Sequence, residues 1–203
     1  LTVGGERLHA PRLLPEGGRL TALGVAACTL GPRIEQRVRE LFHDRRPALA
    51  LALNDLGTEL LFALARLAQD RLQAQAAALG LTMSGELRAG DPGLDLAAQP
   101  QVLRLAGASA IGIGTTSGAQ LTPGMSGTSV HGLGIDLPPT TWSRCDGCPS
   151  AAQCRAATRR RANTAGDAQA QRGAVDRQQF EGMHVDLALA DLDDLAAPGL
   201  GVQ

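Results

Sequence analysis

The first third of the chain contains a continuous apolar run followed by a segment with helical spacing. Residues 20–31 are rich in Leu, Val, Ala and Cys, and they stop at Gly31-Pro32. A short apolar run that ends in turn residues predicts a buried strand. Between Ile34 and Phe42 the apolar side chains recur on one face, so this segment is predicted to form a short amphipathic helix.

The longest periodic pattern comes next and predicts a long helix. Pro47 suits a first helical position, and leucines recur every three to five residues from Leu49 to Leu72. These spacings place the leucines near one face of a helix that ends by Gly80. Gly57 lies inside it and costs about 1 kcal/mol relative to alanine. Close backbone packing and an Ala/Arg/Gly-rich coding bias are both compatible with this glycine.

The pattern then becomes less regular and predicts shorter elements. Residues 81–100 contain several glycines and a proline, and we expect them to be irregular. A short helix is predicted for residues 100–106, and strands are predicted for residues 110–116 and 128–135. A loop with Pro123 joins the two strands. The elements predict an α+β domain with a small sheet against one long helix.

Changes in composition divide the chain into four parts. We expect an N-terminal extension over residues 1–19, the α+β domain over 20–142 and a cysteine/arginine segment over 143–161. Residues 162–203 are rich in Ala, Gln, Asp and Gly, which is typical of a largely disordered tail. Within that tail, residues 185–192, Val-Asp-Leu-Ala-Leu-Ala-Asp-Leu, could form one docked element.

Composition excludes several classes of function. All 19 basic residues are arginine, so Schiff-base catalysis, a pyridoxal phosphate anchor and a phosphate loop are excluded. Aromatic residues make up 2% of the chain, too few for a base-stacking platform. The net charge of -1 argues against duplex DNA as a partner. We therefore expect no nucleic acid partner.

Neither a membrane span nor a leader is expected from the sequence. No apolar run reaches the roughly 20 residues that a membrane helix needs, and residues 1–15 lack the pattern of a secretory signal. These observations predict a cytoplasmic protein. In that compartment, clustered cysteines indicate metal binding or redox chemistry before structural disulfides.

Two short motifs resemble catalytic or cofactor-binding patterns but lack the required context. Gly112-Ile-Gly114 has Ser117 where a dinucleotide fingerprint has its third glycine, and no helix follows. The sequence around Ser126 is one residue short of a nucleophile elbow and precedes a strand. His131 and Asp136 could complete a triad on paper, although a histidine on a half-exposed strand is the simpler interpretation.

Three of the four cysteines form the most distinctive cluster in the sequence. Two residues separate Cys145 from Cys148, and five residues separate Cys148 from Cys154. A Cys-x-x-Cys pair can direct two thiolates at one ion, but a closed zinc site normally has four ligands. Cys28, a histidine or an exogenous ligand could complete it, and an iron–sulfur cluster with one open iron also fits three thiolates. A redox dithiol and inert thiols are the alternatives.

Several motifs, in this order, resemble the activation domain of cobalamin-dependent methionine synthase, and most closely its small stand-alone relatives. The resemblance covers about residues 20–155. The matching segments are Thr29-Leu-Gly-Pro-Arg-Ile-Glu35, Leu53-Asn-Asp-Leu-Gly57, Arg88-Ala-Gly-Asp-Pro-Gly93, Ile111-Gly-Ile-Gly-Thr-Thr116, Pro123-Gly-Met-Ser126, Val130-His-Gly132 and the cysteine motif up to Arg155.

The resemblance implies a twisted antiparallel sheet with a long helix and flanking short helices. It also implies S-adenosylmethionine binding and a role in the reductive remethylation of a corrinoid cofactor. Because the chain contains no obvious cobalamin-binding module, a separate corrinoid-binding methyltransferase would be its partner. The implied ligand residues are Arg88, Asp91, Pro92, Gly93, Pro123 and Ser126, with Arg88 gripping the ligand's carboxylate. No catalytic residue is assigned.

Three positions depart from the family's pattern. Leu94 replaces the tyrosine that follows Pro-Gly, and one extra residue separates Arg88 from that pair. The acidic residue on the family's long helix has only a weak counterpart in Glu59. These departures leave a second function open, in which a zinc- or iron–sulfur-binding electron-transfer or scaffold protein keeps the fold without binding S-adenosylmethionine. A structural partner that docks through the long helix or the tail is a third.

Overall fold

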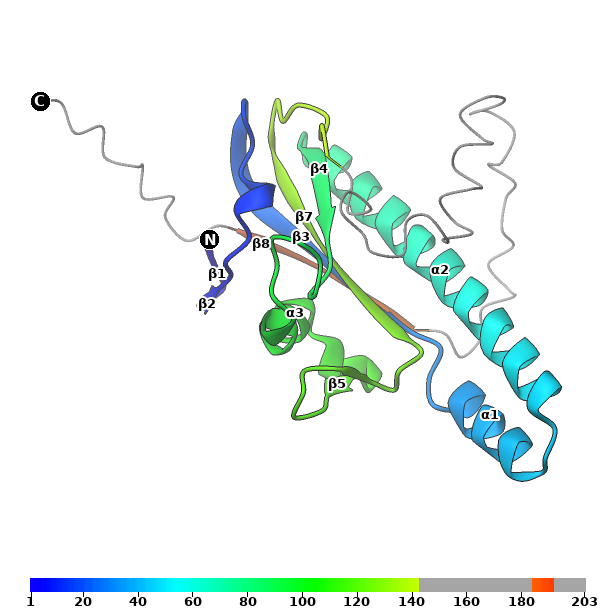
Figure 1. Cartoon of the computed structure of the whole chain (residues 1–203). Coiled ribbons are helices and arrows are strands. Elements are labelled where there is room, and N and C mark those ends of the chain that lie inside the picture. Colours follow the sequence, from blue (N-terminus) through cyan, green and yellow to red (C-terminus); the bar gives the residue numbers. More distant parts are fainter. Residues whose placement is uncertain (143–183, 192–203) are drawn as a thin grey trace, which may run out of the picture.

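The computed structural model describes residues 1–142 and 184–191, and the fold is mixed α and β (Figure 1). The predicted cysteine cluster, at Cys145, Cys148 and Cys154, lies outside the described residues. The central sheet contains β3 (Arg19–Thr29), β4 (Thr82–Leu87), β7 (Ser126–Ile135) and β8 (His184–Asp191). These strands follow the order β4-β7-β3-β8, and every neighbouring pair is antiparallel. The predicted α+β class is thereby confirmed at this level.

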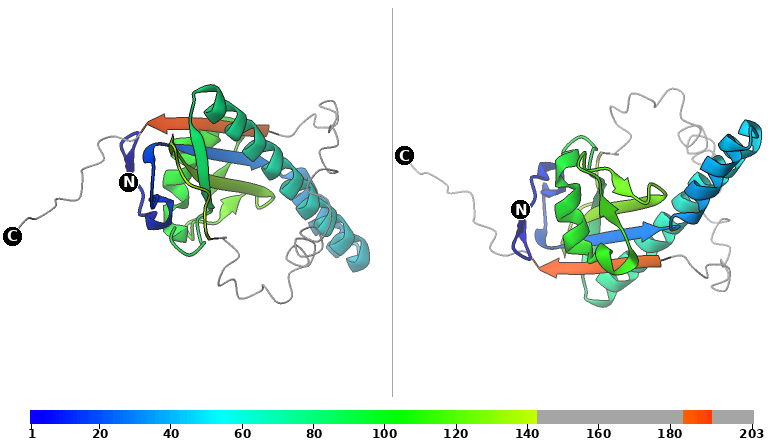
Figure 2. Two further views of the ribbon diagram at one scale, coloured as in Figure 1. Left: turned by 90° about the horizontal axis from the view of Figure 1, so that it is seen from above. Right: turned by 90° about the horizontal axis from the view of Figure 1, so that it is seen from below.

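Helices and the N-terminal segment cover the two faces of the sheet (Figure 2). The helices are α1 (Arg33–His43), α2 (Pro47–Ala78) and α3 (Gln99–Ala106). Short pairs of strands add β1 (Thr2–Val3) with β2 (Glu6–Arg7), and β5 (Gly114–Thr115) with β6 (Leu121–Thr122). Three short 3₁₀ turns complete the described elements at Pro11–Leu13, Leu96–Ala98 and Ala108–Ile111.

Strand β3 is buried on both faces, which explains its continuous apolar sequence. Successive side chains of a strand point to opposite faces. Leu23 and Val25 belong to the core cluster that contains Val102 of α3. On the other face, Ala22 packs with Ala76 of α2, and the Cα of Gly24 lies against the side chain of Leu72. We refer to these as the α3 face and the α2 face of the sheet.

Residues 1–19 belong to the same core as the predicted domain. Val3, Leu8 and Leu13 are buried in the cluster on the α3 face. Arg12 reaches across to the loop after β4, where its Nη1 donates a hydrogen bond to the Pro92 carbonyl at 3.4 Å. Its guanidinium also lies 5.0 Å from the centroid of the Trp142 ring. The segment that was expected to be an extension therefore contributes side chains to the core, and its Arg12 contacts the loop after β4 and Trp142.

Most predicted elements are confirmed, but two segments differ from expectation. Residues 81–100 were expected to be irregular but contain β4. Among the described strands, β4 pairs only with β7, and its Gly85 has a φ of 72°. Residues 110–116 do not form one strand. Ala110 lies in a 3₁₀ turn that ends at Gly112, whose φ is 75°, and only Gly114–Thr115 is extended. A left-handed glycine therefore interrupts this apolar run.

The docked element expected at residues 185–192 is present as strand β8. Strand β8 pairs with β3 from Ala22↔Asp191 to Thr29↔His184. It forms one edge of the sheet (Figure 2). This edge strand lies within the part of the chain that was expected to be largely disordered, and the rest of that part lies outside the described residues.

Helix α2 is much less buried than an ordinary core helix. The first half of α2 and all of α1 extend beyond the sheet as a hairpin (Figure 1). An 18-residue window of α2 has a mean hydropathy of 1.5, and 17% of that window is buried. By length and composition alone this helix could span a membrane, although the sequence contains no uninterrupted apolar run of that length.

Candidate functional site

A β-bulge in β4 builds the polar site around Arg88. The register against β7 shifts between Ser84 and Leu87, where Gly85 takes its left-handed conformation. A bulge re-aims the groups that flank it. Here the Gly85 carbonyl accepts a hydrogen bond from the His131 ring, and the Glu86 carboxylate forms an ion pair with the Arg88 guanidinium.

Glu86 holds the guanidinium of Arg88 by one edge. Its Oε1 lies 3.1 Å from Nε and 3.0 Å from Nη2 of Arg88. The Arg88 side chain is 26% exposed, so the ion pair lies at the protein surface. Because a guanidinium offers donors in a planar fork, the edge formed by Nη1 and Nη2 can bind a second carboxylate in the same plane.

The loop that follows Arg88 is a compact turn fixed by Asp91. Asp91 Oδ2 accepts a hydrogen bond from the Arg88 backbone N–H at 2.9 Å, and the Asp91 N–H donates to the Arg88 carbonyl at 2.9 Å. The φ of Gly93 is 99°, and the Arg12 side chain packs against its Cα. A side chain at residue 93 would collide with Arg12, so this position requires glycine.

Leu94, which replaces the tyrosine of the resembled family, points into the protein. It is 1% exposed and belongs to the core cluster on the α3 face. Its backbone N–H and carbonyl close the turn with Asp91 and Gly90. At this position the side chain supports the loop from beneath and offers no surface to a ligand.

Beneath Arg88, on the α2 face, lie two buried groups that carry no charge. His131 is 0% exposed: its Nδ1 donates to the Gly85 carbonyl at 2.6 Å, and its Nε2 accepts from Ser129 Oγ at 3.1 Å. Burial lowers the pKa of His131, and the nearby Arg88 charge lowers it further, although the Gly85 hydrogen bond and Glu86 oppose this. Burial raises the pKa of the Cys28 thiol, and Arg88 partly opposes that rise. The His131 ring and the Cys28 thiol are therefore both uncharged, and they pack beneath the site.

The structure does not assemble a Ser–His–Asp triad. The partners of His131 are Gly85 and Ser129, whereas Ser126 Oγ donates to Thr29 Oγ1 at 2.8 Å. His131 is also fully buried, which corrects the expectation of a half-exposed strand position. Of the predicted ligand residues, Ser126 instead ties the end of β3 to the start of β7.

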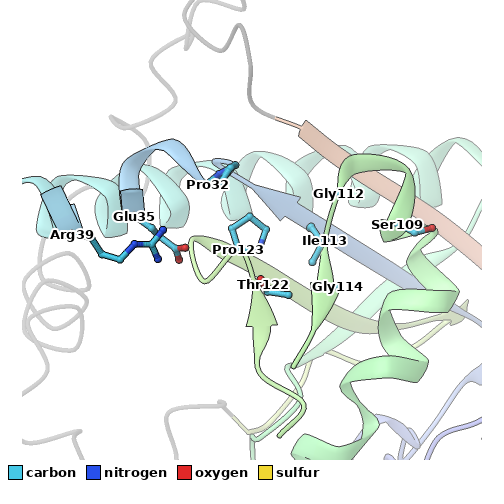
Figure 3. A pocket seen from close by; sticks show the side chains of 9 residues that line it. All are labelled: Pro32, Glu35, Arg39, Ser109, Gly112, Ile113, Gly114, Thr122 and Pro123. Atoms are coloured by element: carbon cyan, nitrogen blue, oxygen red, sulfur yellow. The ribbon is translucent and has the colours of Figure 1, made fainter. Parts of the chain in front are cut away.

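A shallow cavity of about 530 Å³, whose lining does not include Arg88 or its turn, lies at the junction of β3 and α1 (Figure 3). Glu35 and Arg39 lie at one side of it and Ser109 at the other. Glu35 Oε1 accepts a hydrogen bond from the Met125 backbone N–H at 3.0 Å, which fixes the start of β7 against α1. The remaining lining comes from Pro32, Thr122, Pro123 and residues 112–114.

The predicted ligand residues therefore fall into two groups. Arg88, Asp91, Pro92 and Gly93 form one turn after β4. Pro123 lines the shallow cavity, and Ser126 is buried beside it with Thr29 on the α3 face. Sequence reasoning missed Glu86 and His131 as partners in the Arg88 site. Gly85, which permits the bulge, was the available signal, because an isolated glycine in a strand often marks one.

Among the described residues, no group of three or more His, Cys, Asp or Glu side chains could hold a metal ion. A scan against protein-family models and a search of curated proteins found no match to this chain.

Proposed function

We propose that the chain is an S-adenosylmethionine-binding accessory protein with an activation-domain-like fold, which assists reductive remethylation of a corrinoid protein. The order of the motifs from Thr29 to Arg155 supports this proposal. The observation that carries it is the Arg88 site, in which an anchored and partly exposed guanidinium stands beside a glycine-containing turn.

In this proposal, Arg88 binds the carboxylate of the ligand through its Nη1–Nη2 edge while Glu86 keeps the other edge. Asp91 holds the turn, and the backbone at Pro92 and Gly93 lies against the adenosine. The corrinoid would be supplied by a separate methyltransferase chain. The ligand supplies a methyl group, and the role of this chain is to bind and orient it near the cobalt.

Calorimetry with the purified chain tests this role, first alone and then with a corrinoid-binding methyltransferase. We expect S-adenosylmethionine to bind, and Arg88→Gln to weaken binding at least about tenfold, because a hydrogen bond to a charged group contributes roughly 1.5–3 kcal/mol. The matched control is Arg104→Gln, which removes an exposed guanidinium paired with Glu6 elsewhere. Absence of binding in both settings, or equal losses in the two variants, would contradict the proposal.

The second candidate is a zinc- or iron–sulfur-binding protein that keeps the fold without the ligand. The buried position of Leu94 favours it, because the ring that would contact the ligand is replaced by a core side chain. The cysteines that would hold the metal lie outside the described residues. Metal analysis and a visible spectrum after anaerobic purification distinguish the two metals, and a colourless, metal-free protein with titratable thiols would exclude this candidate.

A further inference from the structure

The shallow cavity at the junction of β3 and α1 is lined by three segments that are distant in the sequence. They are α1 with the residue before it, the 3₁₀ turn after α3 with the residues that follow it, and the end of β6. The volume of the cavity, about 530 Å³, lies in the range of small-molecule sites. Pro32, Ile113 and Pro123 give it apolar surface, and Glu35 and Arg39 place charges at one side (Figure 3). The cavity therefore combines apolar surface with charged groups of both signs.

The protein holds the Glu35 carboxylate by one of its two oxygens. Oε1 accepts the hydrogen bond from the Met125 backbone N–H at 3.0 Å. A Cβ at Gly124 would lie 2.5 Å from the same oxygen, so the carboxylate packs directly on the backbone before β7. Within the described part of the chain, Glu35 makes no other hydrogen bond or ion pair. Its Oε2 can therefore accept a hydrogen bond from a ligand in the cavity.

Arg39 is not paired with Glu35, although its position on α1 would allow this. Opposite charges four residues apart on a helix commonly form an ion pair. On the same helix, Arg37 pairs with Glu40 at 2.9 Å. Arg39 forms no ion pair or hydrogen bond with residues 1–142 or 184–191, and its side chain reaches toward Glu35 beside the cavity (Figure 3). Two neighbouring opposite charges thus keep hydrogen-bonding capacity at the cavity.

We propose that this cavity binds a small zwitterion, namely an α-amino acid with an uncharged, apolar side chain. The carboxylate of the ligand binds the guanidinium of Arg39, and its ammonium group donates to Oε2 of Glu35. One carbon separates the two charged groups of an α-amino acid, which suits two protein charges that lie side by side. The apolar side chain of the ligand then lies on Ile113 and Pro123.

Ligands with a charge of one sign fit this cavity less well. An anion bound to Arg39 would place a second negative charge beside Glu35, and a cation bound to Glu35 would lie beside the Arg39 guanidinium; like charges at such short range repel. A metal ion would need further ligands, and no group of three or more His, Cys, Asp or Glu side chains that could hold one occurs among the described residues. A zwitterion satisfies both charges at once.

Titration of the ¹⁵N-labelled full chain with L-leucine, followed by NMR, tests the site. We expect saturable shifts of the Gly112 and Gly114 amides, with a dissociation constant of roughly 1 mM, because so small a ligand in an open cavity binds weakly. N-acetyl-L-leucine lacks the ammonium group and L-leucinamide lacks the carboxylate. Each should bind at least about fivefold more weakly than leucine. An analogue that binds as tightly as leucine would overturn the zwitterion, and no saturable shift at roughly 20 mM leucine would overturn the site.

Two charge variants test the assigned contacts. Arg39→Gln should raise the dissociation constant for leucine at least about fivefold, because it removes the charge that binds the carboxylate. Its matched control is Arg33→Gln, at an exposed arginine of α1 outside the cavity, which should bind like the wild type. Glu35→Gln should weaken binding similarly, since an amide oxygen can still accept from Met125 N–H but carries no negative charge. Equal losses in Arg33→Gln and Arg39→Gln would contradict the proposal.

A steric variant and an Arg88 variant locate the bound leucine. Ser109→Trp places an indole at the exposed edge of the cavity and should abolish leucine binding, whereas Ser117→Trp, at an exposed position outside the lining, should not. S-adenosylmethionine carries the same α-amino acid group, so Arg88→Gln keeps this site distinct from the proposed ligand loop. Leucine binding should be unchanged in Arg88→Gln. Binding that survives Ser109→Trp, or that is lost in Arg88→Gln, would overturn the assignment to this cavity.

Discussion

His131 is a buried histidine whose neutral form is built into the sheet. Its two ring nitrogens are both used, one as a donor to Gly85 and one as an acceptor from Ser129. A proton added to Nε2 would remove the acceptor and place a charge in a buried site close to Arg88. The pKa of His131 in the folded chain is lowered for these reasons, with burial as the largest cause.

This arrangement predicts that acid weakens the fold. The unfolded chain, in which histidine has a pKa of about 6.5, binds this proton more readily than the folded chain does. The free energy of unfolding should therefore fall as the pH drops below about 6.5, by at most about 1.4 kcal/mol per pH unit for one group. Urea denaturation at pH 7.5, 6.5 and 5.5 measures this slope.

The variant His131→Gln should flatten this slope, and His9→Gln, at an exposed position, is the matched control. A slope that is unchanged in His131→Gln would show that other groups cause the acid sensitivity. At the residue scale, the sequence predicted Arg88 as a ligand contact but not its anchor. Glu86 pairs directly with Arg88 from two residues earlier in the chain, but this depends on the bulge at Gly85. His131 comes from a different strand and contacts the Gly85 carbonyl, and such a non-local contact leaves no periodic signal in the sequence.

At the scale of elements, patterns with a strong period were the predictable ones. The apolar run of β3, the amphipathic α1 and the leucine spacing of α2 each predicted the observed element. Strand β4 was missed because it lies at a sheet edge and contains a glycine bulge, which removes the alternation that identifies a strand. The segment around Gly112 was wrongly predicted as extended. Its apolar residues are typical of a strand, but they form a 3₁₀ turn that ends at the left-handed Gly112.

Gly57 shows that packing between elements can outweigh helix propensity. A Cβ at this position would lie 3.0 Å from Ile34 Cγ2 and 3.2 Å from Met125 Cε. Leucine has a higher helix propensity than glycine by about 1 kcal/mol. At position 57, however, a leucine side chain would push α1 away from α2. We expect Gly57→Leu to lower the free energy of unfolding by about 1–3 kcal/mol, as overpacking does.

Urea denaturation compares this variant with Ala52→Leu, which introduces the same leucine side chain at an exposed position of α2. The control should change stability by less than about 0.5 kcal/mol. A Gly57→Leu variant that is as stable as the wild type would mean that α1 is only loosely attached to α2. The close-packing explanation for Gly57 is the one that the structure supports.

At the scale of the whole molecule, the sheet depends on a segment distant in sequence. Strand β8 supplies the outer neighbour of β3 along eight paired positions. A deletion that removes residues 184–203 exposes that edge of β3, whose backbone groups lose their partners. Because a backbone hydrogen bond contributes about 0.5–1.5 kcal/mol net, we expect a loss of several kcal/mol and greater aggregation.

The matched control is a deletion of residues 192–203, which leaves β8 complete. Thermal unfolding should show a clear drop in the midpoint for the longer deletion and little change for the shorter one. Equal midpoints for the longer deletion and the wild type would show that β8 adds nothing to the fold. The sequence predicted that this segment docks, but it did not identify β3 as its neighbour, because strand order depends on the tertiary fold.

The pairing of β3 with β8 also determines the order in which the sheet can form. The nearest paired residues, Thr29 and His184, are separated by 155 positions, the difference between their residue numbers. Contacts of such long range are slow, because the chain must close a long loop before any contact stabilises it. On the ribosome, β3, β7 and β4 emerge well before β8 does. During that interval one edge of the apolar strand β3 lacks its neighbour, and an unpaired strand edge is a site at which nascent chains can aggregate.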